Sequence, residues 1–193
     1  MIEGEDLDKL AMERKVRDFV MKQSDADVSL FYYAGHGMQV AGRNYLVPVD
    51  AQLEDATAVN FETIDLDNVL GYMTGPKKVA IALLDACRDN PLARRFANAM
   101  ASRSIAVGSG LAMPSVLGGG LLIAFATAPG EVALDGTGGN SPFTRALVKY
   151  LPVKGLEIQQ LMTNVKADVY NATHGQQSPW HNSDLREAFF LNR

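Results

Sequence analysis

The segment VAIALLDACR, residues 79–88, is the most informative stretch of the chain. Its first six residues are apolar, and a short apolar run that stops at polar residues is typical of a buried strand. The run ends at Asp85, and Cys87, the only cysteine of the chain, follows two residues later. A thiol directly after a buried strand is a candidate nucleophile at the edge of a sheet.

A second apolar run lies about 50 residues upstream of Cys87. Residues 28–34 read VSLFYYA, and Gly35, His36 and Gly37 follow them. We expect residues 28–34 to form another buried strand, which would place an imidazole flanked by glycines at its end. A thiol and an imidazole at two strand ends indicate a cysteine–histidine site, because the imidazole can accept the thiol proton.

The composition is that of a soluble globular protein. The chain has 193 residues, of which 47% are hydrophobic and 21% charged, enough for one α/β domain with a full core. The net charge of −4 argues against nucleic acid as a partner. Because no apolar stretch approaches the roughly 20 residues that span a bilayer, we expect no membrane partner. A single cysteine and an acidic N-terminus suggest a cytoplasmic protein.

Strands alternate with helices along the chain, which predicts an α/β fold with a mostly parallel sheet flanked by helices. The expected helices cover residues 7–22, 65–72, 142–150 and 156–170. Further strands are expected at 121–127 and 188–191, with a β-hairpin over 38–49. Two details of the helices can be tested: Leu10 belongs to the expected apolar stripe of the first, and Ser141 is the expected N-cap of the third.

These motifs resemble the caspase-like cysteine peptidases, specifically the metacaspase and paracaspase branch of bacteria. The matching segments are FYYAGHG at 31–37, NYLVPVD at 44–50, LDACR at 84–88, FATAPG at 125–130 and NSPFT at 140–144. Caspases similarly carry their histidine about 50 residues before the cysteine.

The resemblance implies a single caspase-like domain. Residues 6–91 are similar to the large subunit of the family and residues 121–193 to the small subunit. Residues 92–120, rich in Gly, Ser, Ala and Met, are expected to be a flexible linker between them.

The resemblance also implies a cysteine endopeptidase in which Cys87 is the nucleophile and His36 the general base. The backbone N–H groups of Gly37 and Cys87 are the expected oxyanion donors, because a glycine lets the backbone approach a substrate carbonyl closely. Cys87 or His36 alone would more often have a structural role, since free cysteines are among the most buried residues. Together they favour catalysis.

Asp85 indicates the substrate. Residues two apart on a strand point to the same face, so Asp85 and Cys87 should project into one cleft. The resemblance implies cleavage after arginine or lysine, because the metacaspase and paracaspase branch has aspartate here and caspases proper have glutamine. A carboxylate also pairs well with a guanidinium. The alternative is a structural carboxylate that caps backbone N–H groups. Glu131 and Asp135 are weaker candidates for this S1 pocket, and a solvated surface role suits each equally.

The linker of this family can be cut during activation, so Arg94, Arg95 and Arg103 are candidate autocleavage sites. Many metacaspases require calcium, which prefers six to eight oxygen ligands. The stretch after Cys87 is mostly basic or apolar. We therefore expect no metal and no other cofactor. The remaining histidines, His174 and His181, lie in a polar segment and are expected to be exposed.

Members of this branch usually begin with a strand, a helix and a second strand ahead of the helix at 7–22, and these elements are expected to be missing here. The strand at 28–34 would then expose an unpaired edge, which invites association, for instance as a homodimer. A non-catalytic caspase-like module that acts by protein association is the main alternative. A flavodoxin-like binding domain fits poorly, because the turn at 35–37 leads into a hairpin and not into a helix N-terminus.

Overall fold

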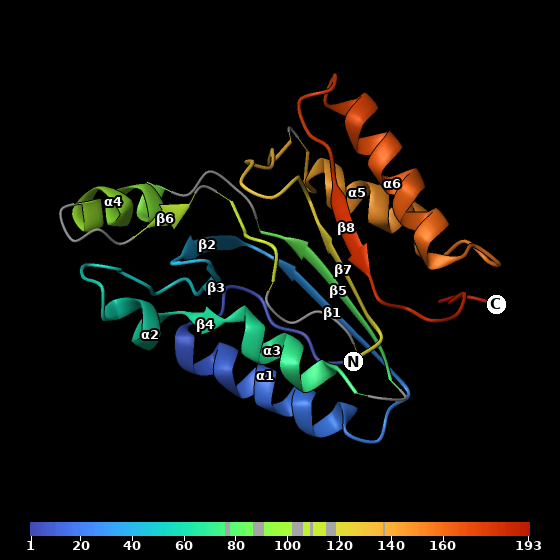
Figure 1. Cartoon of the computed structure of the whole chain (residues 1–193), viewed down its shortest axis with the longest axis horizontal. Helices are drawn as coiled ribbons and strands as arrows, with labels where there is room; N and C mark the ends of the chain where they lie inside the picture. Colours follow the sequence, from blue (N-terminus) through green and yellow to red (C-terminus); the bar gives the residue numbers. More distant parts are fainter. Residues whose placement is uncertain (76–77, 87–90, 102–105, 109, 115–118, 137) are drawn as a thin grey trace.

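A four-stranded sheet forms the centre of the computed structural model, which describes residues 1–75, 78–86, 91–101, 106–108, 110–114, 119–136 and 138–193. The strand order is β1-β5-β7-β8. The strands are β1 (Val28–Ala34), β5 (Val79–Asp85), β7 (Leu121–Phe125) and β8 (Trp180–Ser183). The first three are parallel and β8 is antiparallel to β7. The expected mostly parallel α/β sheet is confirmed (Figure 1).

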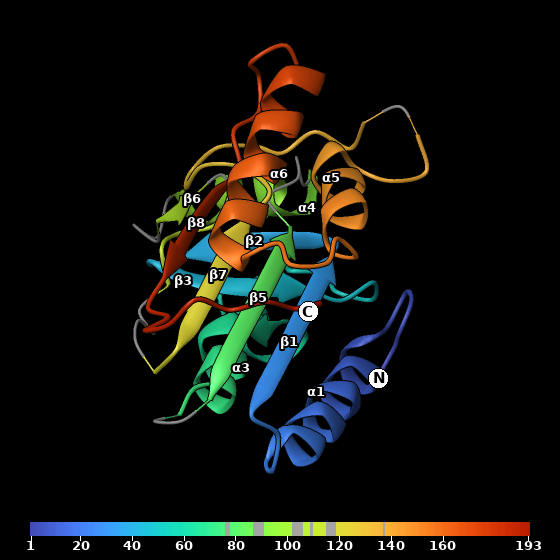
Figure 2. The ribbon, with the colours of Figure 1, turned by 90° about the vertical axis from the view of Figure 1, so that its right-hand side faces the viewer.

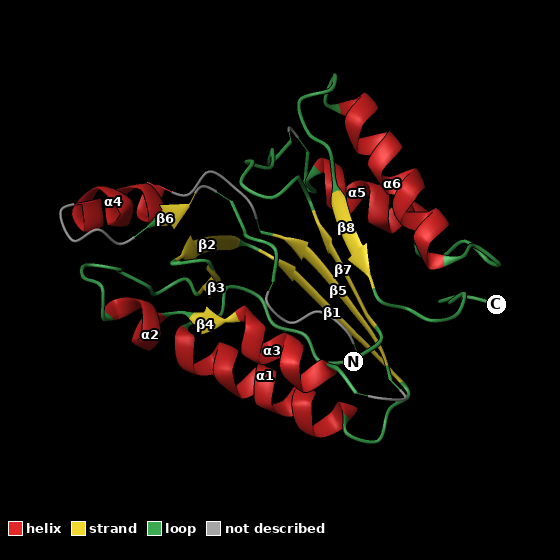
Figure 3. Ribbon diagram, viewed as in Figure 1, coloured by secondary structure: helices red, strands yellow, loops and turns green. Residues whose placement is uncertain are grey.

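A second, antiparallel sheet lies beyond the carboxyl ends of β1 and β5 (Figure 3). Its order is β4-β3-β2-β6. The strands are β2 (His36–Val40), β3 (Arg43–Val47), β4 (Ile64–Asp65) and β6 (Val107–Gly108). The expected hairpin is therefore confirmed as β2–β3, but its first strand begins two residues early, at the histidine itself.

Helices cover both faces of the central sheet, as Figure 2 shows. One face carries α1 (Lys9–Gln23) and α3 (Leu66–Met73), and the other carries α5 (Pro142–Tyr150) and α6 (Ile158–Ala172). All four expected helices are confirmed. Two more, α2 (Ala58–Glu62) and α4 (Pro91–Met100), lie beside the second sheet.

The core follows from this layering. Strands β5 and β7 are buried along almost their whole length, because helices cover both of their faces and such strands read as continuous apolar runs. Strand β1 is the edge of the sheet, so the expectation of a buried strand is wrong there: Val28, Leu30 and Tyr32 are each about 40% exposed. Leu10, which was expected in the apolar stripe of α1, is also exposed, whereas Met12 of the same helix is buried.

Two segments differ from their expected structure. Residues 91–100 form α4 and not an irregular linker, because Phe96 and Met100, four residues apart, bury one helix face against the second sheet. The last strand is β8, at 180–183, whereas residues 188–191 make only an isolated bridge at Phe190. The sequence WHNS is mostly polar and does not have the apolar pattern from which a strand is predicted. Trp180 anchors the strand by packing on Phe125, with ring centroids 5.8 Å apart.

Candidate active site

The two motif-bearing strand ends meet. Strands β1 and β5 pair in a register that places Ala34 beside Asp85. The N–H of Gly35 donates to the carbonyl oxygen of Asp85 at 3.1 Å. A Cβ on Gly37 would lie 2.8 Å from the carbonyl oxygen of Ala86. The segment around the histidine therefore lies directly against the two residues that precede Cys87, which itself falls outside the described residues.

His36 is exposed at the first position of β2, where it pairs with Val47 of β3. The hydroxyl of Tyr33 donates to the carbonyl oxygen of His36 at 2.9 Å and also lies 3.3 Å from the carbonyl oxygen of Val47. A Cβ on Gly35 would lie 2.6 Å from that same hydroxyl. A glycine at 35 thus lets Tyr33 hold the backbone of His36, while the side chain of His36 is exposed to solvent.

Asp85 is fully buried at the end of β5. Its Oδ2 accepts hydrogen bonds from the Oγ of Ser141 at 2.5 Å and the Oγ1 of Thr144 at 2.6 Å. Both donors belong to the first turn of α5, so the carboxylate points toward the N-terminus of that helix. These donors are hydroxyl groups, whereas the alternative role for Asp85 involves backbone N–H groups. Whether Asp85 contacts a substrate remains a prediction.

Sequence reasoning did not identify this hydroxyl group network. Ser141 is predicted only as a helix N-cap, and that prediction is confirmed, since its Oγ accepts from the N–H of Thr144 at 2.9 Å. Thr144 and Tyr32 went unnoticed, although their oxygens lie 2.7 Å apart. The only available signal was two hydroxyl residues at the start of a helix that follows β7.

Glu131 and Asp135 both lie at the surface in the segment after β7. Gly110, at φ 75°, lies against the carbonyl of Glu131 with no room for a Cβ. Gln177 holds the same segment from the other side, because its side chain accepts from the N–H of Leu134 at 3.0 Å. The segment is thus held on two sides, and an S1 role for either carboxylate stays a prediction.

The candidate autocleavage residues divide into two groups. Arg94 and Arg95 lie in α4, and the Nη2 of Arg95 donates to the carbonyl oxygen of Gln52 at 2.8 Å. Because peptidases nick exposed, loosely held segments most readily, cleavage after either arginine would first require α4 to unwind locally. Arg103 lies outside the described residues.

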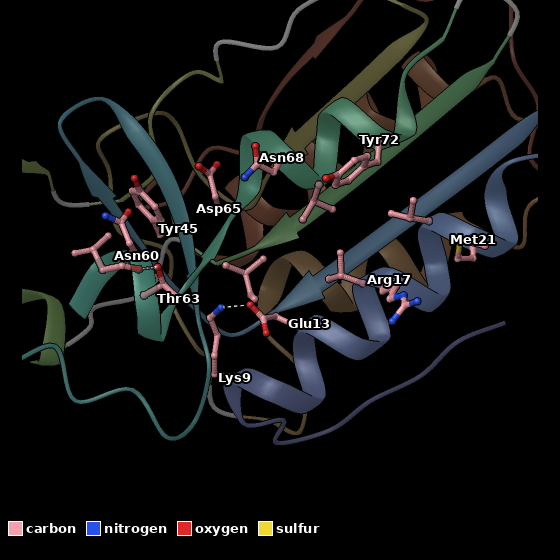
Figure 4. Close-up of a pocket in the computed structure, with 15 residues that line it drawn as sticks. Lys9, Glu13, Arg17, Met21, Tyr45, Asn60, Thr63, Asp65, Asn68 and Tyr72 are labelled. Atoms are coloured by element: carbon pink, nitrogen blue, oxygen red, sulfur yellow. Dashed lines mark hydrogen bonds and ion pairs between the residues drawn. The ribbon is translucent and has the colours of Figure 1, made fainter. Parts of the chain in front are cut away.

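A cavity of about 590 Å³ opens on another part of the molecule, between α1 and the α2–β4–α3 segment (Figure 4). Lys9, Glu13 and Arg17 line it from α1, opposite Asp65 and Tyr72. Of the candidate site residues that the structure describes, neither His36 nor Asp85 lines it. In the wall of this cavity, Lys9 forms an ion pair with Glu13.

The other two histidines differ from each other. His174 is exposed, as expected, but His181 is partly buried in β8 opposite Ala124. Burial, helped by the nearby positive charge of Lys166, lowers the pKa of His181 below its usual 6.5. The expectation of an exposed His181 is wrong because it rested on the polar sequence and missed the strand.

Across the part of the chain that the structure describes, no three His, Cys, Asp or Glu side chains cluster as metal ligands. Among the same residues, none of the helices is long and apolar enough to cross a bilayer.

Comparison with known proteins agrees with this geometry. A family model of the caspase domain matches residues 1–190. No curated protein matches the sequence. Among solved structures, the chain is similar to caspase-1 from Spodoptera frugiperda, with a TM-score of 0.63 and 21% identity over 97% of this chain and 72% of that one. At this identity the likeness shows the fold, and the expected caspase-like arrangement is confirmed.

Proposed function

This chain belongs to the caspase domain family of cysteine peptidases, and we propose that it is an endopeptidase that cuts proteins after arginine or lysine with a Cys87–His36 dyad. One observation carries the proposal. The segment from Gly35 to Gly37 contacts Asp85 and Ala86. The exposed His36, the first residue of β2, therefore belongs to a segment that lies against the residue directly before the cysteine.

The chemistry follows from these two groups. His36 takes the thiol proton of Cys87, and the thiolate attacks the substrate carbonyl carbon. The tetrahedral intermediate places its oxyanion against backbone N–H groups, for which Gly37 and Cys87 are the candidates. When the C–N bond breaks, the imidazolium gives its proton to the leaving amine. Water, deprotonated by the neutral imidazole, then hydrolyses the thioester and restores the thiol.

Asp85 supports a basic residue at P1, the position before the scissile bond. It ends β5, two residues before Cys87 in the sequence, and its carboxylate is held by Ser141 and Thr144. A fixed carboxylate is a strong partner for a guanidinium or an ammonium group. The LDACR segment, at 84–88, supports the proposal that the chain belongs to the metacaspase and paracaspase branch. We propose the cytoplasm as its compartment and neither nucleic acid nor membrane as a partner.

A second function, association without cleavage, is favoured by a different observation. One edge of β1 has no partner strand among the residues that the structure describes, and three apolar side chains are exposed along it. Such an edge can add a strand from another chain. A caspase-like module that binds partners, or a homodimer, would use this edge.

Hydrolysis of fluorogenic peptides with Arg, Lys or Asp at P1 tests the proposed reaction. We expect cleavage of the Arg and Lys peptides and none of the Asp peptide. Cys87→Ala and His36→Ala should abolish it. Asp85→Ala should lower kcat/KM for both basic peptides by at least about 100-fold, because a buried ion pair with the substrate is lost. We expect a calcium chelator to leave the rate unchanged.

Two results would contradict the proposal. Cleavage that persists in Cys87→Ala would exclude the dyad, and full activity in Asp85→Ala on the Arg peptide would exclude its S1 role. A wild-type chain that cuts none of the peptides yet captures a partner through β1 would favour the association module.

A further inference from the structure

A line of three oxygen-bearing side chains runs from the surface of the sheet to Asp85. The hydroxyl of Tyr32, on exposed β1, lies 2.7 Å from the Oγ1 of Thr144 on α5. Thr144 is partly buried and donates to the Oδ2 of Asp85 at 2.6 Å. Asp85 is fully buried. The line thus connects an exposed tyrosine to the carboxylate proposed to bind the substrate.

The direction of every proton in this line follows from counting hydrogens. Thr144 has one hydroxyl proton and gives it to Asp85, so Tyr32 must be the donor in its contact with Thr144. Ser141 also gives its proton to Asp85, while its oxygen accepts from the N–H of Thr144. All three hydroxyl groups are oriented, and two of them converge on one carboxylate oxygen.

This arrangement holds the buried carboxylate of Asp85 in one orientation. A buried charge is costly unless it is hydrogen-bonded, and hydrogen bonds to a charged acceptor are the stronger kind. The N-terminal end of α5 adds a favourable dipole for the negative charge. With two donors on Oδ2, rotation of the carboxylate about its Cβ–Cγ bond would break both bonds, so its plane is held.

We propose that Thr144 is a positioning residue for substrate selection: its hydroxyl holds the carboxylate of Asp85 in the orientation that receives an arginine or lysine side chain. The inference rests on the proposed cleavage after basic residues. Tyr32 acts one step further out, by orienting the hydroxyl of Thr144. Because recognition of a planar guanidinium depends on the plane of its partner, a misplaced carboxylate loses affinity for the substrate even when its charge remains.

The role of the Thr144 hydroxyl can be separated from the capping of α5. The cap is made by the Oγ of Ser141 and the backbone N–H of Thr144, and neither involves the side chain of Thr144. Thr144→Val therefore removes the donor to Asp85 with nearly unchanged volume and leaves the helix cap in place. Thr144→Ser keeps the hydroxyl. Thr163→Val, at an exposed threonine of α6 that bonds only within its helix, is the matched control.

The experiment compares these variants in three assays: kcat/KM on Arg and Lys peptides, the rate at which iodoacetamide alkylates Cys87, and the thermal unfolding midpoint. Thr144→Val should lower kcat/KM on both peptides by about 10- to 100-fold, the loss that accompanies one hydrogen bond to a charged group. Thr144→Ser should recover kcat/KM to within about threefold of the wild type, and Thr163→Val should match the wild type. Alkylation by iodoacetamide needs no P1 side chain, so its rate should stay within about twofold of the wild-type rate in every variant.

The outcomes distinguish the inference from the proposed function. If the wild type cuts basic peptides and Thr144→Val cuts them equally well, the inference fails and the proposed function stands. An equal loss of cleavage and alkylation in Thr144→Val would assign the threonine a purely structural role and also overturn the inference. If the wild type cuts no peptide with a basic P1 residue but cuts a peptide with another P1 residue, both the inference and the proposed function fail.

Discussion

At the scale of single residues, the site is organised by close backbone approach. Gly35 lets the hydroxyl of Tyr33 reach the carbonyl of His36, and Gly37 lies against Ala86 without room for a Cβ. A larger residue at 35 would collide with the side chain of Tyr33, and one at 37 would push the start of β2 away from Ala86. Both glycines therefore allow close packing around His36, and the oxyanion role proposed for Gly37 would depend on its contact with Ala86.

His181, which is partly buried in β8, leads to a prediction about the pH dependence of stability. The folded state lowers the pKa of His181, so the unfolded chain binds its proton first as the pH falls. The stability that His181 contributes is complete above about pH 6.5 and is lost as the pH falls from there through the lower folded pKa. Between pH 7 and pH 5, the wild type should therefore lose more thermal stability than His181→Asn.

The measurement is the unfolding midpoint by circular dichroism at pH 5, 6 and 7. His174→Asn, at the exposed histidine, should follow the wild type at all three values. Parallel curves for the wild type and His181→Asn would show that burial of this imidazole does not contribute to the pH dependence.

Residue chemistry explains which parts of the site could be predicted from sequence. Cys87 and His36 stand at the ends of apolar runs, so their roles as candidates follow from local sequence alone. The partners of Asp85 do not, because Thr144 is 59 positions away and nothing in its own neighbourhood signals the contact. Contacts across layers of a fold depend on packing, which the local sequence pattern does not reveal.

At the scale of elements, the β2–β3 hairpin positions the histidine. It begins at His36 and turns at Ala41 and Gly42, which have φ angles of 49° and 82°. Two positive φ values in a two-residue turn match the twist of a hairpin, and glycine or asparagine suits both positions. Ala41 is therefore strained, since a side chain with a Cβ disfavours this region.

This strain predicts two opposite effects on stability. Ala41→Gly should raise the free energy of unfolding by about 1 kcal/mol, because it relieves the left-handed conformation. Gly42→Ala should lower it by about 1 kcal/mol; a Cβ there meets nothing within 4 Å, so the cost is in the backbone alone. Urea unfolding would measure both through the midpoint at constant slope. A fall in stability for Ala41→Gly would contradict the account of the turn.

Strands could be predicted from sequence where both of their faces are buried. Strands β5 and β7 appear as continuous apolar runs in the sequence. Strand β8 was missed because its four residues are all partly buried at a sheet edge and show no alternation. Helix α4 was missed because small residues and two arginines surround its buried Phe96 and Met100.

At the scale of the whole molecule, the central sheet ends at β1. Ordinary sheets protect their edges with charge, proline or a bulge, and the sequence VSLFYYA has none of these. One face of β1 contacts α1, where Phe31 lies 6.1 Å from Phe19 between ring centroids. The other face is only partly covered, by α5 through the contact of Tyr32 with Thr144. The edge and this second face together form a surface suited to one more strand.

The exposed edge predicts that the 193-residue chain self-associates through β1. Only alternate residues of β1 direct their backbone N–H and C=O groups toward β5, so the others offer theirs at the opposite edge. Val28, Leu30 and Tyr32 add apolar area that association would remove from water. We expect a concentration-dependent rise in mass by sedimentation velocity between about 1 and 100 µM, the range of a weak to moderate interface. Leu30→Lys, which puts a charge on the edge strand, should shift the chain toward monomer.

A matched control separates this edge from general hydrophobicity. Val153 lies between α5 and α6, outside β1, and is about as exposed as Leu30, at 43% against 39%. Val153→Lys should therefore associate like the wild type. If the wild type stays monomeric throughout, or if both variants lose association equally, β1 is not the interface. If Leu30→Lys dissociates but still cuts Arg peptides, the dyad works within one chain and the edge serves assembly alone.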